Sequence, residues 1–216
     1  MKPLLLDLFC GAGGAAVGYH RAGFDVVGVD INPQPDYPFE FHQADAIDYL
    51  LGHFARYAAV HASPPCQAHT TLAKGTNNNT GDYPDLIAIT RGVLSMIARP
   101  YVIENVPSSP LLYPITLCGE MFGLDVIRHR DFESNRLLLQ PSHPRHRGRV
   151  AGWRHGVKVD GPYLAVYGRG GDKGTIATRQ AAMGCEWITS YAALGEAIPP
   201  AYTEYVGAQL LTVAEL

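Results

Sequence analysis

The chain has 216 residues, of which 47% are hydrophobic and 17% charged, and its formal net charge is −3 at pH 7. This length suits one hydrophobic core with a small second lobe, and the composition excludes a disordered chain. No apolar run approaches the roughly 20 residues that cross a membrane, and an acid follows the leucines near the N-terminus, so no secretory signal is expected. These features predict a soluble protein of the cytoplasm.

The N-terminal residues predict a strand, a turn, a helix and a second strand. Residues 4–9 form a short, continuous apolar run that is typical of a buried parallel strand. The glycines of residues 11–14 predict a tight turn into a helix over residues 15–22. Residues 25–29 predict a second strand that finishes at Asp30. Together these segments form one βαβ unit.

Strands and helices continue to alternate further along the chain. Residues 57–62 predict a strand that leads into Ser63-Pro64-Pro65-Cys66, residues 86–98 a helix, and residues 101–103 a strand that ends in Glu104-Asn105-Val106. This alternation predicts an α/β protein with a Rossmann-like, doubly wound, mainly parallel sheet. The polar residues between the Pro-Pro-Cys turn and residue 85 predict a mobile loop.

The second half of the chain carries a concentrated positive charge. Residues 128–158 hold eight basic residues against two acidic ones, although the whole chain is net negative. Such segregation is typical of a surface for nucleic-acid phosphates, and the alternative is a solvated basic loop. Since the alternation of helix and strand fades over residues 131–178, we expect a small recognition lobe there. Residues 1–130 and 179–216 would form the catalytic domain, with helical character over residues 191–211 interrupted by Pro199-Pro200.

The four cysteines do not indicate a disulfide framework or a zinc ribbon. They stand at positions 10, 66, 118 and 185, without a Cys-x-x-Cys pair. His61 and His69 flank Cys66, and His143 lies near His146, but neither group contains a second tight ligand pair. We therefore expect no metal site.

Polar or reactive residues follow three of the predicted strands, namely Asp30, Cys66 and Glu104. Ligands of open parallel sheets bind at this edge. A glycine turn beside Asp30 suits a nucleoside-containing cofactor, because the backbone can approach closely and a carboxylate can accept ribose hydroxyls. NAD-linked dehydrogenases share this feature. Cys66 is a candidate nucleophile or a small buried hydrophobe, and Glu104 beside buried surface needs a partner or has a raised pKa that suits proton donation.

Four blocks of the chain resemble, in order, the signature blocks of the DNA (cytosine-5) methyltransferases. They are Asp7-Leu8-Phe9-Cys10-Gly11-Ala12-Gly13-Gly14, Pro65-Cys66-Gln67, Glu104-Asn105-Val106 and Gly195-Glu196-Ala197-Ile198-Pro199-Pro200. The resemblance implies a class I S-adenosylmethionine-dependent fold, transfer of a methyl group to carbon 5 of cytosine in double-stranded DNA, and S-adenosylhomocysteine as product. An RNA (tRNA) cytosine-5 methyltransferase and a catalytically silent DNA-binding member of the fold stay open, whereas a dehydrogenase leaves the second and third blocks unexplained.

The resemblance also implies catalytic roles. In the family a thiolate adds to carbon 6 of a flipped-out cytosine while an acid at N3 takes up the developing charge, which makes carbon 5 nucleophilic. Cys66 would be the thiolate and Glu104 the N3 partner, and Arg130 would help hold the flipped base. The remaining candidates of this group are Gln67, Asn105 and Arg128. Val126 stands where the family carries a glutamine before its two arginines.

The implied cofactor site combines the first block, the end of the second strand and the C-terminal block. Its expected residues are Asp7, Phe9, Gly11, Ala12, Gly13, Gly14, Asp30, Ile31, Asp45, Ala46, Pro65, Glu196 and Ala197. Asp30 would bind the ribose and Asp45 the adenine amine. Two residues depart from the family pattern: Glu196 replaces an asparagine, and Ser63-Pro64 replaces Gly-Phe.

The recognition region is short for this family. Only about fifty residues separate Arg130 from Arg179, so few base-edge contacts are available, each worth roughly 1–3 kcal/mol of discrimination. We expect a recognition site of about two base pairs or loose specificity. The expected DNA contacts are His143, Arg145, His146, Arg147 and Arg149.

Overall fold

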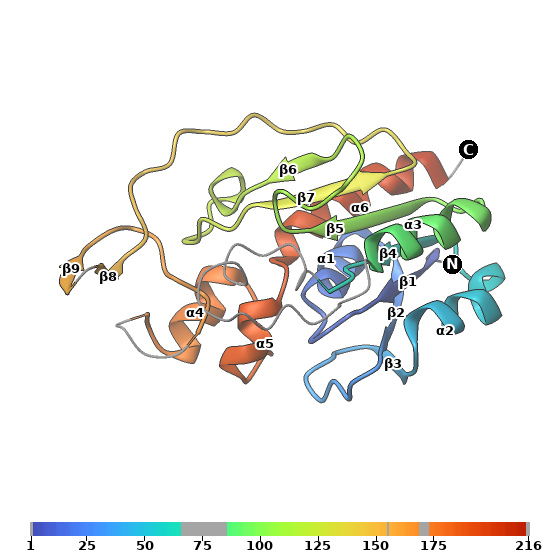
Figure 1. The fold of residues 1–216 in the computed structure, drawn as a ribbon, viewed down its shortest axis with the longest axis horizontal. Helices are drawn as coiled ribbons and strands as arrows, with labels where there is room; N and C mark the ends of the chain where they lie inside the picture. Colours follow the sequence, from blue (N-terminus) through green and yellow to red (C-terminus); the bar gives the residue numbers. More distant parts are fainter. Residues whose placement is uncertain (1, 66–85, 155, 169–172, 215–216) are drawn as a thin grey trace.

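A seven-stranded sheet forms the centre of the computed structural model, which describes residues 2–65, 86–154, 156–168 and 173–214 (Figure 1). The strand order is β3-β2-β1-β4-β5-β7-β6. The first five of these strands run parallel, and β7 is antiparallel to both of its neighbours. The strands span Leu4–Leu8 (β1), Asp25–Asp30 (β2), Glu40–Gln43 (β3), Ala59–Ala62 (β4), Tyr101–Asn105 (β5), Ile115–Leu117 (β6) and Arg130–Ser134 (β7). The predicted doubly wound, mainly parallel sheet is confirmed.

Helices cover both faces of this sheet (Figure 1). Helices α1 (Gly14–Ala22) and α6 (Pro200–Ala214) pack on one face, and α2 (Ala46–His53) and α3 (Leu86–Met96) on the other. Successive side chains of a strand point to opposite faces. Leu5 therefore packs in the α1 and α6 core, while Leu6 and Leu8 pack against α2 and α3. Burial on both faces explains why β1 and β4 read as continuous apolar runs.

Four elements of the sheet domain were not predicted from the sequence. β3 and α2 follow β2, and β6 and β7 form the antiparallel edge. β7 contains four polar residues and one phenylalanine. Its two acidic side chains can be buried because each has an ion-pair or hydrogen-bond partner. Glu133 pairs with Arg91 at 2.7 Å, and Asp131 accepts a hydrogen bond from the Thr116 hydroxyl at 2.7 Å.

The chain between β7 and α4 (Ile176–Met183) contains little regular structure. Its two short strands, β8 (Gly152–Arg154) and β9 (Val157–Val159), form a separate antiparallel pair at the far end of the molecule from α2 and α3 (Figure 1). Residues 131–134 belong to β7 of the large sheet, so a recognition lobe would begin after Ser134. The division into two domains stays a prediction.

The C-terminal part returns to the sheet domain. α4 and α5 (Tyr191–Glu196) contribute to a third apolar cluster that also contains Ala12 and Val126. α5 ends at Glu196 and α6 begins at Pro200, so the helical stretch is interrupted just before and at the two prolines, as predicted. Within the described residues, no helix combines the length and the hydrophobicity that crossing a membrane requires.

Candidate active site

Asn105 holds the turn that leads to the candidate nucleophile. It is the last residue of β5 and is 2% exposed. Its side-chain amide donates to the Pro64 carbonyl at 2.9 Å, and its carbonyl oxygen accepts from the Val106 amide and from the Ser109 hydroxyl. Asn105 therefore fixes the start of the Pro-Pro-Cys turn from the neighbouring strand.

Cys66 and Gln67 lie outside the described residues, as does the predicted mobile loop up to residue 85. Of this block the structure describes Pro65, which is exposed, and the buried Pro64 before it. β4 ends at Ala62 and is directly paired with β5. The second and third blocks of the sequence therefore emerge from neighbouring parallel strands at the same edge of the sheet.

Glu104 and Arg130 form a buried ion pair at this edge. The Arg130 Nε lies 3.0 Å from a Glu104 carboxylate oxygen, and the Glu104 side chain is 7% exposed. Burial raises the pKa of Glu104, whereas the Arg130 guanidinium and the Ser63 hydroxyl oppose this shift. A carboxyl group that is pushed toward its protonated form beside a fixed cation can donate a proton to a base bound in front of it.

A hydrogen-bonded chain behind Glu104 was not anticipated from the sequence. Buried His61 of β4 contacts the Tyr19 hydroxyl at 3.0 Å through Nδ1 and the Ser63 hydroxyl at 2.8 Å through Nε2. Burial lowers the pKa of His61 to about 3, so the imidazole is neutral. The signal in the sequence was a lone histidine inside an otherwise apolar strand, which we had considered only as a metal ligand.

The glycine turn after β1 carries the expected backbone geometry. Phe9, Gly11 and Gly13 all have positive φ angles, of 55°, 49° and 81°. A Cβ atom on Gly14 would overlap the Ile198 carbonyl, so the C-terminal block lies directly against this turn. The sequence block predicted to fold back onto the turn does so.

Further hydrogen bonds join the same two segments. Trp187 Nε1 donates to the Ala12 carbonyl at 2.8 Å. The Thr203 hydroxyl donates to the Ala15 carbonyl, also at 2.8 Å. Of the expected C-terminal site residues, Ala197 is buried and Glu196 is exposed.

Asp30 lies at the end of β2 beside the glycine turn. Its carboxylate accepts hydrogen bonds from the Gly11 amide at 3.1 Å and the Asn32 amide at 2.9 Å. The next residue, Ile31, is 65% exposed. A carboxylate in this position can accept hydrogen bonds from ribose hydroxyls, and the exposed apolar side chain after it can cover one face of an aromatic ring.

Asp7 is a buried acid whose two carboxylate oxygens make no hydrogen bond of regular geometry to a described residue. Burial raises its pKa well above the ordinary range, the nearby Asp30 adds to this shift, and the Tyr37 hydroxyl opposes it. Burial therefore favours the protonated form of Asp7, which lies on the strand before the glycine turn.

Asp45 and Arg128 make structural contacts that the sequence did not indicate. Asp45 is the N-cap of α2, where its carboxylate accepts from the Ile47 and Asp48 amides, and Ala46 is the buried first residue of that helix. Arg128 donates to the Gly195 carbonyl at 2.6 Å. Burial lowers the pKa of Arg128 to about 9, with a smaller contribution from Arg130.

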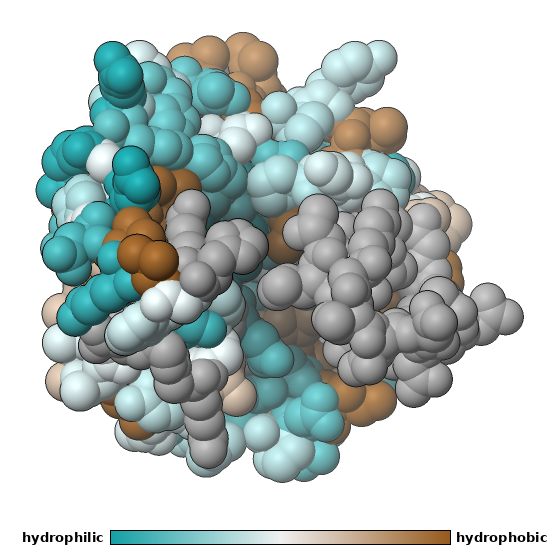
Figure 2. Space-filling model, turned by 60° about the vertical axis from the view of Figure 1, so that its left-hand side comes forward, coloured by the Kyte–Doolittle hydropathy of each residue, from teal (hydrophilic) through white to brown (hydrophobic). Residues whose placement is uncertain are grey.

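The five expected DNA contacts fall into three groups. Arg145 and Arg149 are exposed, and neither shows a hydrogen bond or ion pair to another described residue. Arg147 is bound to Glu120 at 3.1 Å and lies over the Tyr163 ring. His143 and His146 gather with Cys118 and His129. Hydrophilic side chains dominate much of the face shown in Figure 2, with separate hydrophobic patches among them.

Comparison with known proteins places this fold among methyltransferases. Two solved structures match nearly the whole chain: the Dnmt2 methyltransferase of S. pombe, with 16% identity, TM-score 0.65 and 100% coverage of both chains, and the Entamoeba histolytica methyltransferase EhMeth, with 14% identity, TM-score 0.64 and 99% coverage of both chains. Neither a protein-family model nor a curated protein sequence matches the chain. The chain therefore has the class I S-adenosylmethionine-dependent methyltransferase fold.

Proposed function

We propose that this protein transfers a methyl group from S-adenosylmethionine to carbon 5 of cytosine in DNA, at a short recognition site. The observation that carries the proposal is the pairing of two strand ends. Asn105 of β5 holds Pro64, two residues before Cys66, and Glu104 of the same strand is buried against Arg130. The residues that lead to Cys66 and the carboxyl group of Glu104 therefore lie at the same edge, where ligands of such sheets bind, and this supports a nucleophile and a proton donor acting together.

Glu104 supplies the proton that the reaction needs. When the Cys66 thiolate forms a bond to carbon 6, electron density moves through the ring toward N3, and a proton from Glu104 neutralises it. Carbon 5 then reacts as an enamine-like nucleophile, and Arg130 stabilises the Glu104 carboxylate that is left. After alkylation, a base removes the carbon-5 proton, the bond between carbon 6 and sulfur breaks, the thiolate is released, and N3 returns its proton to the Glu104 carboxylate.

The cofactor site fits adenosylmethionine at the residues that the structure describes. Gly11 and Gly13 have positive φ angles, a Cβ atom on Gly11 would meet no other atom within 4 Å, and Asp30 with Ile31 provides a carboxylate beside an exposed apolar side chain. When bound, the cofactor supplies an electrophilic methyl group. Its further contacts would come from Asp7, Ala12, Gly14, Asp45, Ala46, Pro65, Glu196 and Ala197.

The DNA substrate is supported by the family resemblance and by the exposed arginines after β7. Arg145 and Arg149 are available to phosphates. A cytosine inside a duplex must leave the base stack before Glu104 can reach N3. Because few residues are available to contact base edges, the recognition site is short.

Transfer of a tritiated methyl group from adenosylmethionine to unmethylated duplex DNA tests the proposal. Wild type should label the DNA and release labelled 5-methylcytosine on digestion, Cys66→Ala should give no label, and Cys185→Ala, at a buried cysteine of the third apolar cluster, should label like wild type. DNA containing 5-fluorocytosine should form a stable covalent complex with wild type but not with Cys66→Ala. The general base that removes the carbon-5 proton cannot remove fluorine, so the bond between sulfur and carbon 6 is not broken.

Two outcomes would replace the proposal. Label in tRNA but not in DNA would assign the same chemistry to an RNA substrate, whose 2′-hydroxyls the protein would then have to accommodate. Cofactor binding without label in either nucleic acid would identify a silent member of the fold.

A further inference from the structure

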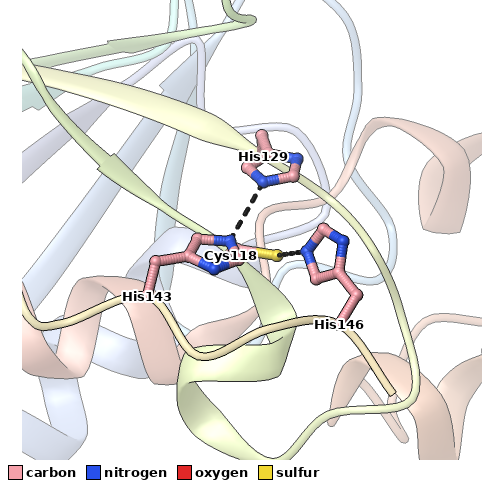
Figure 3. A group of neighbouring side chains, drawn as sticks. All are labelled: Cys118, His129, His143 and His146. Atoms are coloured by element: carbon pink, nitrogen blue, oxygen red, sulfur yellow. Dashed lines mark hydrogen bonds between the residues drawn. The ribbon is translucent and has the colours of Figure 1, made fainter. Parts of the chain in front are cut away.

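Three histidines and one cysteine converge at the edge of the sheet formed by β6 and β7. Cys118 directly follows β6, His129 directly precedes β7, and His143 and His146 come from the irregular chain after β7. One potential ligand atom from each residue lies within 4.8 Å of all the others. Figure 3 shows the rings and the sulfur gathered around a common centre.

The two shortest distances match the edges of a tetrahedral metal site. His129 Nε2 and His143 Nε2 are 3.2 Å apart, and Cys118 Sγ is 3.5 Å from His146 Nε2. Zinc bonds of about 2.0–2.1 Å to nitrogen and 2.3 Å to sulfur put tetrahedral ligand atoms about 3.4 Å (N···N) and 3.6 Å (N···S) apart. Two of the six distances between ligand atoms therefore match the edges of a tetrahedral site, and all six lie within 4.8 Å.

A backbone contact orients one of the ligands. His143 Nδ1 lies 2.6 Å from the Pro144 carbonyl, which can only accept, so this nitrogen carries the proton. The lone pair of the imidazole is then on Nε2, the atom that faces His129. Metal-bound histidines characteristically donate their other ring proton to a carbonyl or carboxylate in this way.

The surroundings favour a neutral imidazole at His129 and leave an entry path for an ion. Burial, with the neighbouring His143 and His146, lowers the pKa of His129. Burial raises the pKa of the Cys118 thiol, and a bound zinc ion displaces such a proton outright. Cys118 is fully buried and His143 is exposed, so an ion can enter from the His143 side.

We propose that Cys118, His129, His143 and His146 form a structural zinc site. Imidazole and thiolate ligands in a tetrahedron favour Zn²⁺, and four protein ligands leave no open position for a substrate. The ion would fasten residues 143–146, which have no helix or strand of their own, to the start of β7. It would thereby position Arg145 and the segment next to Arg130. The proposal differs from the expectation of no metal site. That expectation rested on the lack of a second ligand pair near His143 and His146 in the sequence, and the fold supplies this pair from Cys118 and His129.

Metal analysis of the full chain, purified without an affinity tag or a metal column, tests this site. We expect one zinc per chain in wild type and loss of that zinc in the His143→Ala and His146→Ala variants. Removal of His143 leaves no cavity in the core because this side chain is exposed. His42→Ala is the matched control, since His42 is 40% exposed and lies on β3, and it should keep the zinc.

Cobalt substitution then reports the geometry and the sulfur ligand. Metal-free wild type titrated with Co²⁺ should show the visible bands of tetrahedral cobalt and a thiolate-to-cobalt charge-transfer band, and Cys118→Ser should lose the latter. The zinc affinity of His143→Ala should fall by more than the roughly 10- to 100-fold that loss of an outer hydrogen-bond partner costs. Equal zinc affinity in wild type and His143→Ala, or an octahedral cobalt spectrum in wild type, would refute the site and leave a hydrogen-bonded cluster of neutral side chains.

Discussion

The sheet domain and the chain after β7 hold their functional groups in different ways. Glu104 and Asn105 are 5% and 2% exposed, and their strand is buried along its whole length. In residues 135–159, which follow β7, Leu137 is 80% exposed and Trp153 56%, and none of the described side chains is buried, so few apolar contacts hold this segment. Its order depends on polar contacts such as that of Arg147 with Glu120.

Under the proposed function, this difference separates the residues of the chemistry from those of recognition. Reactive groups on buried strands are fixed by the same packing that stabilises the fold, so substitutions there affect both stability and rate. Groups on a weakly packed segment can be changed with little effect on the core, as is usual for loops that carry binding residues. The following predictions test that separation, from the largest expected effect to the smallest.

Glu104→Gln should give the largest effect, a fall in kcat/KM of roughly 10²–10⁴-fold, because the amide cannot donate the carboxyl proton. Methyl transfer to DNA measures it. Glu133→Gln is the matched control, since Glu133 is another buried, arginine-paired glutamate of the sheet. It should lower the melting temperature and leave the rate per folded molecule nearly unchanged. Equal losses of rate in the two variants would argue against proton donation by Glu104.

Gly14→Ala should lower the free energy of unfolding by about 3 kcal/mol, which is the upper end of the cost of overpacking. The added methyl group would overlap the Ile198 carbonyl, which is backbone and cannot rotate away. Chemical denaturation measures the loss. Gly92→Ala in α3 has open space around the new methyl group and should instead stabilise the helix, by up to about 1 kcal/mol. Similar effects of the two variants would show that the turn and the C-terminal block are not in close contact.

His61 should make the fold sensitive to acid. Its pKa is about 3 in the folded chain and 6.5 when unfolded, so only the unfolded chain binds a proton between these values and stability falls as the pH falls through this window. Between pH 7 and pH 5 we expect a loss of about 2 kcal/mol from this residue. Denaturation curves of His61→Gln should lack this part of the pH dependence, whereas His53→Gln, at an exposed histidine, should retain it.

Arg149→Ala should have the smallest effect, confined to DNA binding. In a plot of the logarithm of DNA affinity against the logarithm of salt concentration, loss of one phosphate contact makes the slope shallower by about one unit. The change should be the same for all DNA sequences. Arg147→Ala should lower the melting temperature, because it removes the contacts with Glu120 and Tyr163. A stable Arg147→Ala variant with the same reduced salt dependence would place Arg147 among the phosphate contacts instead.

The sequence predicted the parts of the fold that apolar burial determines. β1, β2, β4 and β5 are short apolar runs with a polar residue near the end, and such runs identify buried parallel strands without further information. β3 and β7 were not predicted because their sequences are largely polar. The acids of β7 are tolerated only because Arg91 and Thr116, distant in sequence, meet them in the folded chain.

The same limit applies to the site. Strand ends placed Asp30 and Glu104 correctly at one edge of the sheet, and the glycine turn was predicted from its composition. The contacts of Asn105 with Pro64 and of Arg128 with Gly195 depend on the register of neighbouring elements, which local patterns do not specify. The gathering of Cys118 and His129 with His143 and His146 was missed for that reason as well.

The contact of residues 12–15 with residues 187–203 has a consequence for synthesis of the chain on the ribosome. The glycine turn is made early, but its partners Trp187, Ile198 and Thr203 emerge only after nearly all other elements of the sheet have been made. Until α6 arrives, the face of the sheet that it shares with α1 is incompletely covered, and exposed apolar surface of this kind favours aggregation. The nascent chain therefore exposes this apolar face for longer than the early position of its glycine turn would imply.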